Sequence, residues 1–589
     1  MVFALVASAT VFAQGAVAPA CAAPRAEVQG DLDPDLRQAI VTAIGESDRP
    51  IQNRFAARRR AQEAGEDAIA VLRSEGYYAY GVEAEVGEGD QPSPRVSIKP
   101  GPRFSIADPS VAWVGAPPAE DVRQAGEAAI DLTVGAPGRA ADVVAAEGRI
   151  VAAVQKRGHA DAAAEPREVI VDHADHTVRP TFRISAGDLV RLDGIQLITR
   201  GRTNPHWLDR LAAWKPGEVY DPENVAELER RLLDTGVYDS VTVALAPSEK
   251  ATAGLRPVIV SLADRERRTL ELGASYSTNA GLGLDGRWTR YNTLGRADTL
   301  STVGRLSSLD SKVGVELQLP HWRRPQQTLK VSGAAYRRQT DAYDETGVGV
   351  AADVQRRFHK TSYLTLGTTL DFSRTEELQT QTLTPLGRDL VVGAVLGVLS
   401  LDRSDDPLNP RRGWRLEGRA EPTVLAGEGM RTYLKLQTQG SIYFPFGDQA
   451  RTVIAGRLKL GSMIAGTIPD VPASRRFYAG GGGSVRGYSY QAVGPRLADN
   501  TPQGGVSLLE TSIELRQQVS HRWSVVGFVD AGAVGTNEFP TGKDLSAGAG
   551  LGVRYDMGFG PIRADVAVPL DKRKGDSAFQ IYLSIGQSF

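Results

Sequence analysis

The chain has 589 residues, with 68 basic and 70 acidic side chains and a formal net charge of -2. This length exceeds that of one ordinary domain, and 41% apolar with 23% charged residues excludes a disordered composition. Because binding to nucleic acid requires a basic excess or a basic stripe, the near-neutral balance predicts no nucleic-acid partner.

The first 23 residues have the character of an export signal. The stretch 2–20 is almost wholly apolar or small, and Ala20-Cys21-Ala22 offers a small-residue cleavage site. A lipoprotein anchor at Cys21 is the alternative, which the preceding Ala18-Pro19-Ala20 fits poorly. Cys21 is the only cysteine, so a chain processed after it has no disulfide, thiolate metal site or cysteine nucleophile. We therefore predict a signal peptide at 1–23.

The first half of the chain repeats one order of elements: an amphipathic helix that ends at a glycine, followed by two strands. The three glycines, about 80 residues apart, are Gly76, Gly158 and Gly236. In the third copy Asp221 is placed to cap the helix. The spacing predicts three small α+β repeats at 24–100, 101–187 and 188–264, with one larger α/β domain as the alternative.

The second half, 265–589, alternates apolar residues with polar or small ones. One such stretch places Ile562, Ala564, Val566, Val568 and Leu570 on one face, and Arg563, Asp565 and Ala567 on the other. A soluble sandwich would have to bury these charges in its core. A membrane barrel accepts them in a polar interior. The alternation therefore predicts an all-β transmembrane barrel of about sixteen antiparallel strands.

The predicted first and last strands, 269–278 and 579–589, must meet to close this barrel. In the last strand Phe579, Ile581, Leu583, Ile585 and Phe589 are expected to share the outer face, with Tyr582 on the other. An aromatic end suits the membrane interface. A weak seam there would offer unpaired backbone groups to an added strand.

No catalytic, cofactor or metal motif stands in the required context. The segment 281–286 matches G-x-G-x-x-G, but it lies inside the alternating region rather than between a strand and a helix. His173 and His176 lack a third ligand. We therefore predict neither an enzyme nor a cofactor.

Two segments of the barrel region form the candidate site. The first is a glycine-rich stretch that leads to Val485-Arg486-Gly487-Tyr488, and the second places Phe528, Asp530 and Gly532 on one strand face. An arginine on a loop folded into the interior needs a partner, and the Asp530 carboxylate can accept a bidentate bond from Arg486. The alternative is that Arg486 lies on an exposed loop and Asp530 is merely a polar interior residue.

These motifs resemble those of the outer-membrane assembly and export superfamily that includes BamA, TamA and two-partner secretion transporters. Val485-Arg486-Gly487-Tyr488 is similar to the inward-folded loop motif of that family, Phe528-x-Asp530-x-Gly532 to its partner strand, and 560–589 to its terminal strands. The resemblance covers nearly the whole mature chain. Three repeats before a barrel are most similar to TamA, and the resemblance implies that they are POTRA domains in the periplasm.

The resemblance also implies a function. It implies insertion or translocation of unfolded outer-membrane or autotransporter clients, through strand pairing at the seam of a barrel in the outer-membrane bilayer. It further implies a TamB-like partner anchored in the inner membrane. The alternatives are a transporter for one dedicated exoprotein and a passive porin or receptor.

Overall fold

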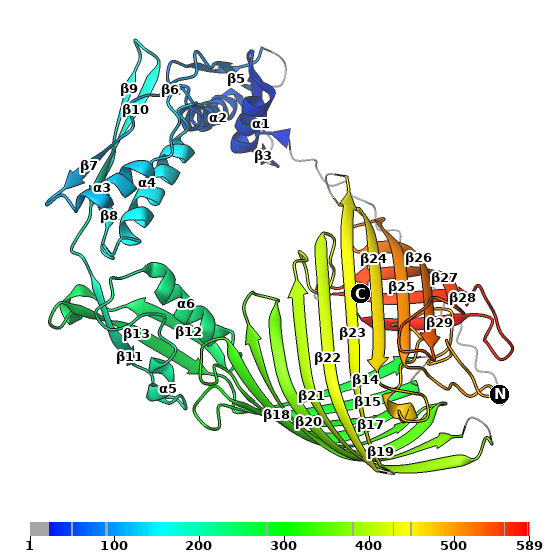
Figure 1. Ribbon diagram of the computed structural model, residues 1–589. Coiled ribbons are helices and arrows are strands. Elements are labelled where there is room, and N and C mark those ends of the chain that lie inside the picture. Colours follow the sequence, from blue (N-terminus) through cyan, green and yellow to red (C-terminus); the bar gives the residue numbers. More distant parts are fainter. Residues whose placement is uncertain are drawn as a thin grey trace. The chain divides into compact units, whose positions relative to one another are not determined.

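The computed structural model describes residues 23–48, 51–88, 92–277, 281–379, 382–427, 429–447, 450–558, 560–585, 587 and 589. The predicted signal peptide, with Cys21, lies outside this part apart from Ala23. A small α/β N-terminal region precedes a sixteen-stranded antiparallel sheet, which confirms the predicted fold class (Figure 1).

The chain divides into two compact units. The first comprises Met1–Asp193, Trp214–Val225 and Ala246–Pro257, and the second comprises Gly194–Ala213, Ala226–Leu245 and Val258–Phe589. The division runs through the third α/β segment, so part of that segment belongs to the same unit as the barrel.

The first α/β segment has two helices against a three-stranded sheet in the order β2-β5-β4. Its elements are β1 (Ala23–Pro24), β2 (Glu27–Gln29), α1 (Pro34–Ile44), β3 (Glu46–Ser47), α2 (Arg54–Ser74), β4 (Gly81–Val86) and β5 (Pro94–Lys99). Ile40, Leu72 and Val96 share its buried core. Gly76 follows α2 with a φ of +90°, where glycine is favoured because it has no Cβ to clash.

The second segment also packs two helices against a sheet, here of five strands. Its elements are β6 (Ser105–Ile106), β7 (Ser110–Val114), α3 (Glu120–Ala128), α4 (Ala140–Gln155), β8 (Ala163–Ala164), β9 (Glu168–Asp172) and β10 (Thr177–Ser185). All four other strands pair with β10. Phe104, Ile150 and Phe182 are fully buried in the core between sheet and helices, as their apolar character requires.

The third segment contains a three-stranded sheet in the order β11-β13-β12. Its elements are β11 (Arg191–Leu197), α5 (Pro205–Asp209), α6 (Pro222–Leu233), β12 (Tyr238–Leu245), the 3-10 turn η1 (Ser248–Lys250) and β13 (Leu255–Asp264). Asp221 Oδ1 accepts the Glu223 N–H at 2.9 Å, which caps α6. Leu228 and Leu232 on α6 are fully buried.

The barrel sheet runs in sequence order, each strand paired antiparallel with the next. Its strands are β14 (Arg268–Ser277), β15 (Gly281–Tyr291), β16 (Thr299–Ser307), β17 (Asp310–Leu319), β18 (Gln327–Gln339), β19 (Tyr343–Arg357), β20 (Tyr363–Leu378), β21 (Pro385–Asp402), β22 (Gly413–Gly427), β23 (Gly429–Phe446), β24 (Thr452–Ile464), β25 (Ser507–Gln518), β26 (Trp523–Gly535), β27 (Ser546–Asp556), β28 (Pro561–Pro569) and β29 (Gln580–Ile585). The end at which β14 begins, directly after the third segment, is called the near end below, and the opposite end the far end.

The burial pattern of the strands is that of a barrel with a polar interior. In β28, Ile562 and Val566 are 40% and 49% exposed, whereas Arg563 and Asp565 are 6% and 0% exposed. The apolar side chains face outward and the charged ones inward, the reverse of a soluble core. Separately, none of the helices in the described ranges combines the length and the apolarity that a membrane span requires.

The last strand differs from the prediction. It is β29 (Gln580–Ile585), shorter than the predicted 579–589, and Phe579 precedes it. Ile581 and Leu583 are 41% and 48% exposed on the outer face, as expected. The expected outward position of Phe589 is wrong, because its ring packs beside Tyr443 and lies 5.5 Å and 5.4 Å from the guanidinium carbons of Arg457 and Arg516. Inward-facing arginines attract the ring face there.

The near-end turns of the barrel contact the third segment within the second unit. Asn292, in the turn after β15, donates to the Thr203 hydroxyl at 3.2 Å, and the Asn204 N–H donates to the Gly295 carbonyl at 2.8 Å. His321, in the turn after β17, lies 2.9 Å from the Arg231 carbonyl through Nε2 and accepts the Gln326 N–H on Nδ1 at 3.0 Å. These bonds hold part of the third segment against the first hairpins.

We predict that this contact weakens in acid. Burial lowers the pKa of His321 and outweighs the bond to the Arg231 carbonyl, which raises it; the charges of Arg231 and Arg357 lower the pKa further, and Asp234 raises it. A histidine with a lowered pKa stabilises the fold fully above its unfolded pKa of about 6.5, and that contribution is lost as the pH falls through that value toward the folded pKa. Protonation would also remove the Nδ1 acceptor of the Gln326 bond.

Hydrogen exchange of residues 320–326 at about pH 7.5 and about pH 5.5 tests this, using the window set by the histidine pKa. We expect loss of protection at the lower pH in the natural chain and a smaller pH effect in His321→Gln. The same pH response in both proteins would contradict the assignment.

Candidate functional site: an inward loop tied to the barrel wall

The connection between β24 and β25, residues 465–506, folds into the barrel and is called the inward loop. It carries the turn η2 (Ala473–Arg475). A set of its apolar side chains packs against inward-facing wall residues in one buried cluster. The loop members are Val471, Phe477, Ala479, Val485, Tyr488 and Val493, and the wall members include Leu390, Tyr433, Met463 and Leu508. The predicted motif therefore lies on a buried loop rather than an exposed one.

Arg486 forms a bidentate ion pair with Asp530 of β26. Its Nε lies 2.6 Å from Asp530 Oδ2 and its Nη2 lies 2.9 Å from Oδ1, while its backbone N–H donates to Oδ2 at 3.0 Å. Arg486 is 1% exposed and Asp530 is 0% exposed. Charge-assisted paired bonds of this kind fix both position and orientation.

Two further carboxylates complete the surroundings of Arg486. Glu514 Oε1 of β25 lies 2.7 Å from Nη1, and Asp565 Oδ2 of β28 lies 3.1 Å from it. The guanidinium carbon stands 3.4 Å from the ring centroid of Phe528, so this motif residue forms a cation–π platform. Arg486 thus joins strands β25, β26 and β28, and we call this set the tip clamp.

The buried carboxylates of the tip clamp are shared with other arginines. Arg516 binds Glu514 at 2.9 Å, and Arg554 binds Asp565. A buried charge is tolerated only when it is paired and hydrogen-bonded, and this sharing supplies the pairing. Sequence reasoning placed Asp565 on the inner face but singled out neither Asp565 nor Glu514 as a partner of Arg486, because many inward positions carry charge and alternation alone does not rank them.

The neighbours of Arg486 in the motif connect the inward loop to the last strand. The Gly487 N–H donates to the Tyr582 hydroxyl at 3.1 Å, and that hydroxyl donates to the Tyr488 carbonyl at 3.0 Å. Tyr582 lies on β29, at the edge of the sheet. Opposite Val485, a Cβ on Gly532 would come within 2.6 Å of Val485 Cγ2, so glycine at 532 permits the close approach.

We predict that Gly487→Ala dislodges the motif. Gly487 has a φ of +103°, and a Cβ there would lie 2.7 Å from the Val568 carbonyl oxygen on β28. Left-handed backbone strain and this clash together disfavour the docked loop by about 1–3 kcal/mol. Limited proteolysis should cut the inward loop faster in this variant. Gly483→Ala is the matched control, since no heavy atom of the described residues lies within 4 Å of its Cβ position. Equal cleavage of both variants would contradict the prediction.

A second ionic contact, missed from the sequence, holds the start of the inward loop. Arg475 Nη2 lies 3.5 Å from Glu345 and 3.3 Å from Asp371, and Arg476 Nη2 lies 2.9 Å from Glu377. Glu345 is on β19, and Asp371 and Glu377 are on β20. We call these five residues the base clamp. The only sequence signal was the arginine pair directly before Phe477.

Arg476 also binds the loop itself. It donates to the carbonyls of Val471, Gln503 and Ile468 at 2.8, 2.9 and 2.9 Å. One side chain therefore ties the outgoing and returning limbs of the inward loop to each other and to β20. The loop spans the interior between two separate groups of strands.

Among the described residues, no ladder of backbone hydrogen bonds closes the seam between the first and last strands. The sheet order runs from β14 to β29, and no backbone pairing joins these two strands within the described parts of either one. They approach each other only at a few positions. Facing edges without paired N–H and C=O groups are open to pairing with another strand.

The described ranges contain no group of three or more His, Cys, Asp or Glu side chains suited to a metal ion. His173 and His176 each place their ring edge-to-face with Phe104, with centroids 5.3 Å apart. These two histidines pack against the core of the second segment, which is a structural role.

The comparisons with known proteins place the barrel in a family. The model of the Omp85 superfamily domain matches residues 292–589, and the chain belongs to the Omp85 superfamily. BamA from Haemophilus ducreyi lacking POTRA domains 1-3 has a similar fold, with a TM-score of 0.69 at 19% identity, over 82% of this chain and 99% of that one.

Two curated relatives are named outer membrane protein assembly factor BamA. The one from Neorickettsia risticii is 22% identical over 436 residues, 71% of this chain and 57% of that protein. The one from Neisseria meningitidis serogroup B is 22% identical over 482 residues, 70% of this chain and 58% of that protein. The chain therefore spans less than two thirds of the length of either relative.

Proposed function

We propose that this chain is a non-enzymatic outer-membrane assembly factor, which inserts or translocates unfolded client proteins by pairing their strands at the β14–β29 seam. The observation that carries the proposal has two parts: the described residues of β14 and β29 form no backbone pairing across the seam, and the buried loop is bound to the seam strand β29 through Tyr582. A client strand can add to an open edge because its backbone groups satisfy those of β14 or β29.

In this proposal the near end of the barrel faces the periplasm. The three α/β segments, with predicted limits 24–100, 101–187 and 188–264, are POTRA domains that receive clients there. The order of helix and strands in each segment supports this assignment. Autotransporter clients, and a TamB-like partner anchored in the inner membrane, follow from the resemblance to TamA and belong to the same proposal.

A passive porin is disfavoured by the inward loop. The loop occupies the interior with a buried apolar cluster and two ionic clamps, a costly arrangement for a protein that only has to pass small solutes. A transporter for one dedicated exoprotein uses the same loop and remains the competing outcome of the test.

Quantitative proteomics of the outer membrane and the culture medium after deletion of the gene tests the proposal. We expect several barrel or autotransporter proteins to fall in the membrane fraction and to recover when the natural chain is restored. Loss of one secreted protein from the medium, with the membrane proteins intact, would replace the proposal with the dedicated transporter. No change in either fraction would overturn both.

A further inference from the structure

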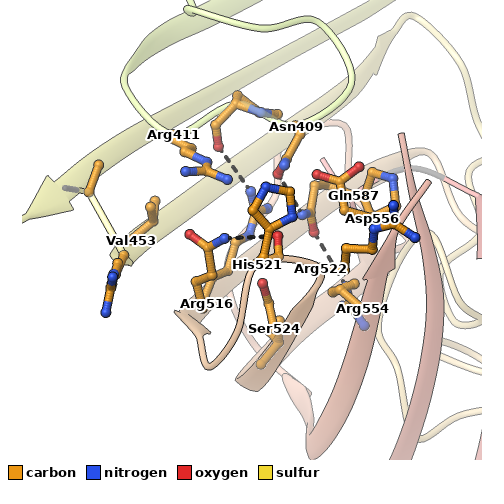
Figure 2. A pocket seen from close by; sticks show the side chains of 16 residues that line it. Asn409, Arg411, Val453, Arg516, His521, Arg522, Ser524, Arg554, Asp556 and Gln587 are labelled. Atoms are coloured by element: carbon orange, nitrogen blue, oxygen red, sulfur yellow. Dashed lines mark hydrogen bonds between the residues drawn. The ribbon is translucent and has the colours of Figure 1, made fainter. Parts of the chain in front are cut away.

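An arginine-rich pocket lies at the near end of the barrel, and two of its arginines, Arg516 and Arg554, also bind carboxylates of the tip clamp. It is formed by the near-end turns after β21, β23, β25 and β27, together with the inner faces of the adjoining strands (Figure 2). Among the described residues that line it are five arginines and one histidine but only one carboxylate. The basic residues are Arg411, Arg451, Arg516, Arg522, Arg554 and His521, and the acid is Asp556.

The floor of the pocket is buried and still has hydrogen-bonding capacity. Arg554 is 2% exposed, and its Nη2 has no hydrogen-bond partner among the described residues, although its Nη1 binds Asp565. Arg516 is 5% exposed and already bound: it pairs with Glu514 at 2.9 Å and donates to the Pro410 and Phe589 oxygens at 3.3 Å each, so the open donor is that of Arg554. A buried guanidinium N–H left without an acceptor is unfavourable, so this floor favours an anionic acceptor.

The rim of the pocket is accessible. Arg451 and Arg522 are exposed, and Arg522 Nη1 donates to the Tyr555 hydroxyl at 3.3 Å. Figure 2 shows side chains from separate turns, including Arg411, His521 and Arg522, gathered around one space. Convergent cations in a concave site raise the local concentration of anions.

The floor of the pocket lies on the inner face of the barrel wall and not on its outer face. Arg516 and Arg554 alternate along their strands with Leu515 and Val553, which are 50% and 42% exposed on the outer face. An anion that reaches Arg554 must therefore enter from the mouth of the barrel. This geometry favours a polypeptide side chain over the headgroup of a lipid whose tails lie outside.

We propose that this pocket binds carboxylate side chains of an unfolded, acidic polypeptide segment as it arrives at the near end of the barrel. The proposal rests on the proposed function, because a protein that handles unfolded chains meets such segments at the side of its POTRA domains. Guanidinium groups and carboxylates form charge-assisted, often bidentate, bonds. The pocket lies on strands close to β29, so a bound segment is held near the seam.

Fluorescence anisotropy with the full chain in detergent micelles tests the pocket directly. The probes are a labelled, unstructured peptide of about ten residues that alternates threonine with aspartate, and the same peptide with asparagine in place of aspartate. We expect the natural chain to bind the acidic peptide about tenfold more tightly, because each charge-assisted bond contributes on the order of 1.5 kcal/mol. The preference should shrink at high salt.

The variant Arg451→Gln/Arg522→Gln removes two rim arginines, and we expect it to lose about tenfold in affinity for the acidic peptide. The matched control is Arg337→Gln/Arg374→Gln, since both side chains are 58% exposed and lie toward the far ends of β18 and β20. Heat-dependent gel migration of each protein verifies that its barrel is folded.

Equal binding of the two peptides, or equal loss in both double variants, would overturn the proposal. A third result would also overturn it: the rim variant binds the acidic peptide as well as the natural chain does but binds a short-chain anionic phospholipid more weakly. That result would identify the pocket as a lipid site. Because the assay measures binding by the isolated protein, its failure leaves the proteomic test of assembly intact, and the reverse also holds.

Discussion

Arg486→Ala should abolish most assembly activity while leaving much of the barrel in the membrane. The substitution leaves Asp530, Glu514 and Asp565 buried without their shared cation, and removal of one member of a buried ionic network is typically unfavourable by about 3–5 kcal/mol. Most of that penalty falls on the docked loop, because the strands keep their own ladders.

The measurement for Arg486→Ala is the level of client barrels in the outer membrane, compared with the amount of folded variant in the same fraction. Arg374→Ala, at a side chain 58% exposed near the far end of β20, is the control. Arg486→Lys should be impaired as well, because an ammonium cannot form the bidentate pair. Full activity of Arg486→Ala would refute a functional role for the tip clamp.

Arg476→Ala should release the other end of the inward loop. The Arg476 side chain is 7% exposed. The variant would lose the ion pair with Glu377, and the three carbonyls that now accept its hydrogen bonds would be left without that donor. Leaving buried acceptors unsatisfied costs about 1–3 kcal/mol each, so the base of the loop should detach. Glu377 would keep its ion pair with Arg388, 3.1 Å away, so we expect β20 to stay folded in the variant.

The effect of Arg476→Ala is measured by labelling a cysteine placed at Ser474 with a maleimide. In the otherwise natural loop Ser474 lies 3.1 Å from the Thr375 hydroxyl, and we expect slow labelling there and faster labelling in the Arg476→Ala background. Arg337→Ala serves as the control for loss of an arginine. Identical labelling rates would show that the base clamp does not hold the loop.

The architecture was predictable because its signals are local. Alternation in stretches such as 562–570 defines an inner and an outer face within one strand, whatever the neighbouring strands are. The Arg486–Asp530 pair could also be predicted, since the resemblance brought together two motifs that are distant in the sequence.

The base clamp was not predictable for a physical reason. Arg475 lies 130 residues from Glu345 and 104 residues from Asp371, and their contact depends on the path of the inward loop across the interior. No periodicity encodes that path. Phe589 was misplaced for a related reason: strand alternation was extended beyond Ile585, where the chain leaves the sheet and meets interior arginines.

The central claim is that clients are assembled at the β14–β29 seam, and cross-linking of that seam tests it most directly. Cysteines at Leu272 of β14 and Leu583 of β29, both exposed on the outer face at 80% and 48%, place one thiol on each side of the seam in a chain whose Cys21 is replaced, and a series of reducible cross-linkers of increasing length identifies one that joins them. The assay is the folding of a denatured client barrel into proteoliposomes, followed by heat-dependent gel migration. We predict that the cross-linked protein loses its acceleration of client folding and that reduction restores it, whereas each single-cysteine protein stays active. Undiminished acceleration by the fully cross-linked protein would contradict assembly at the seam.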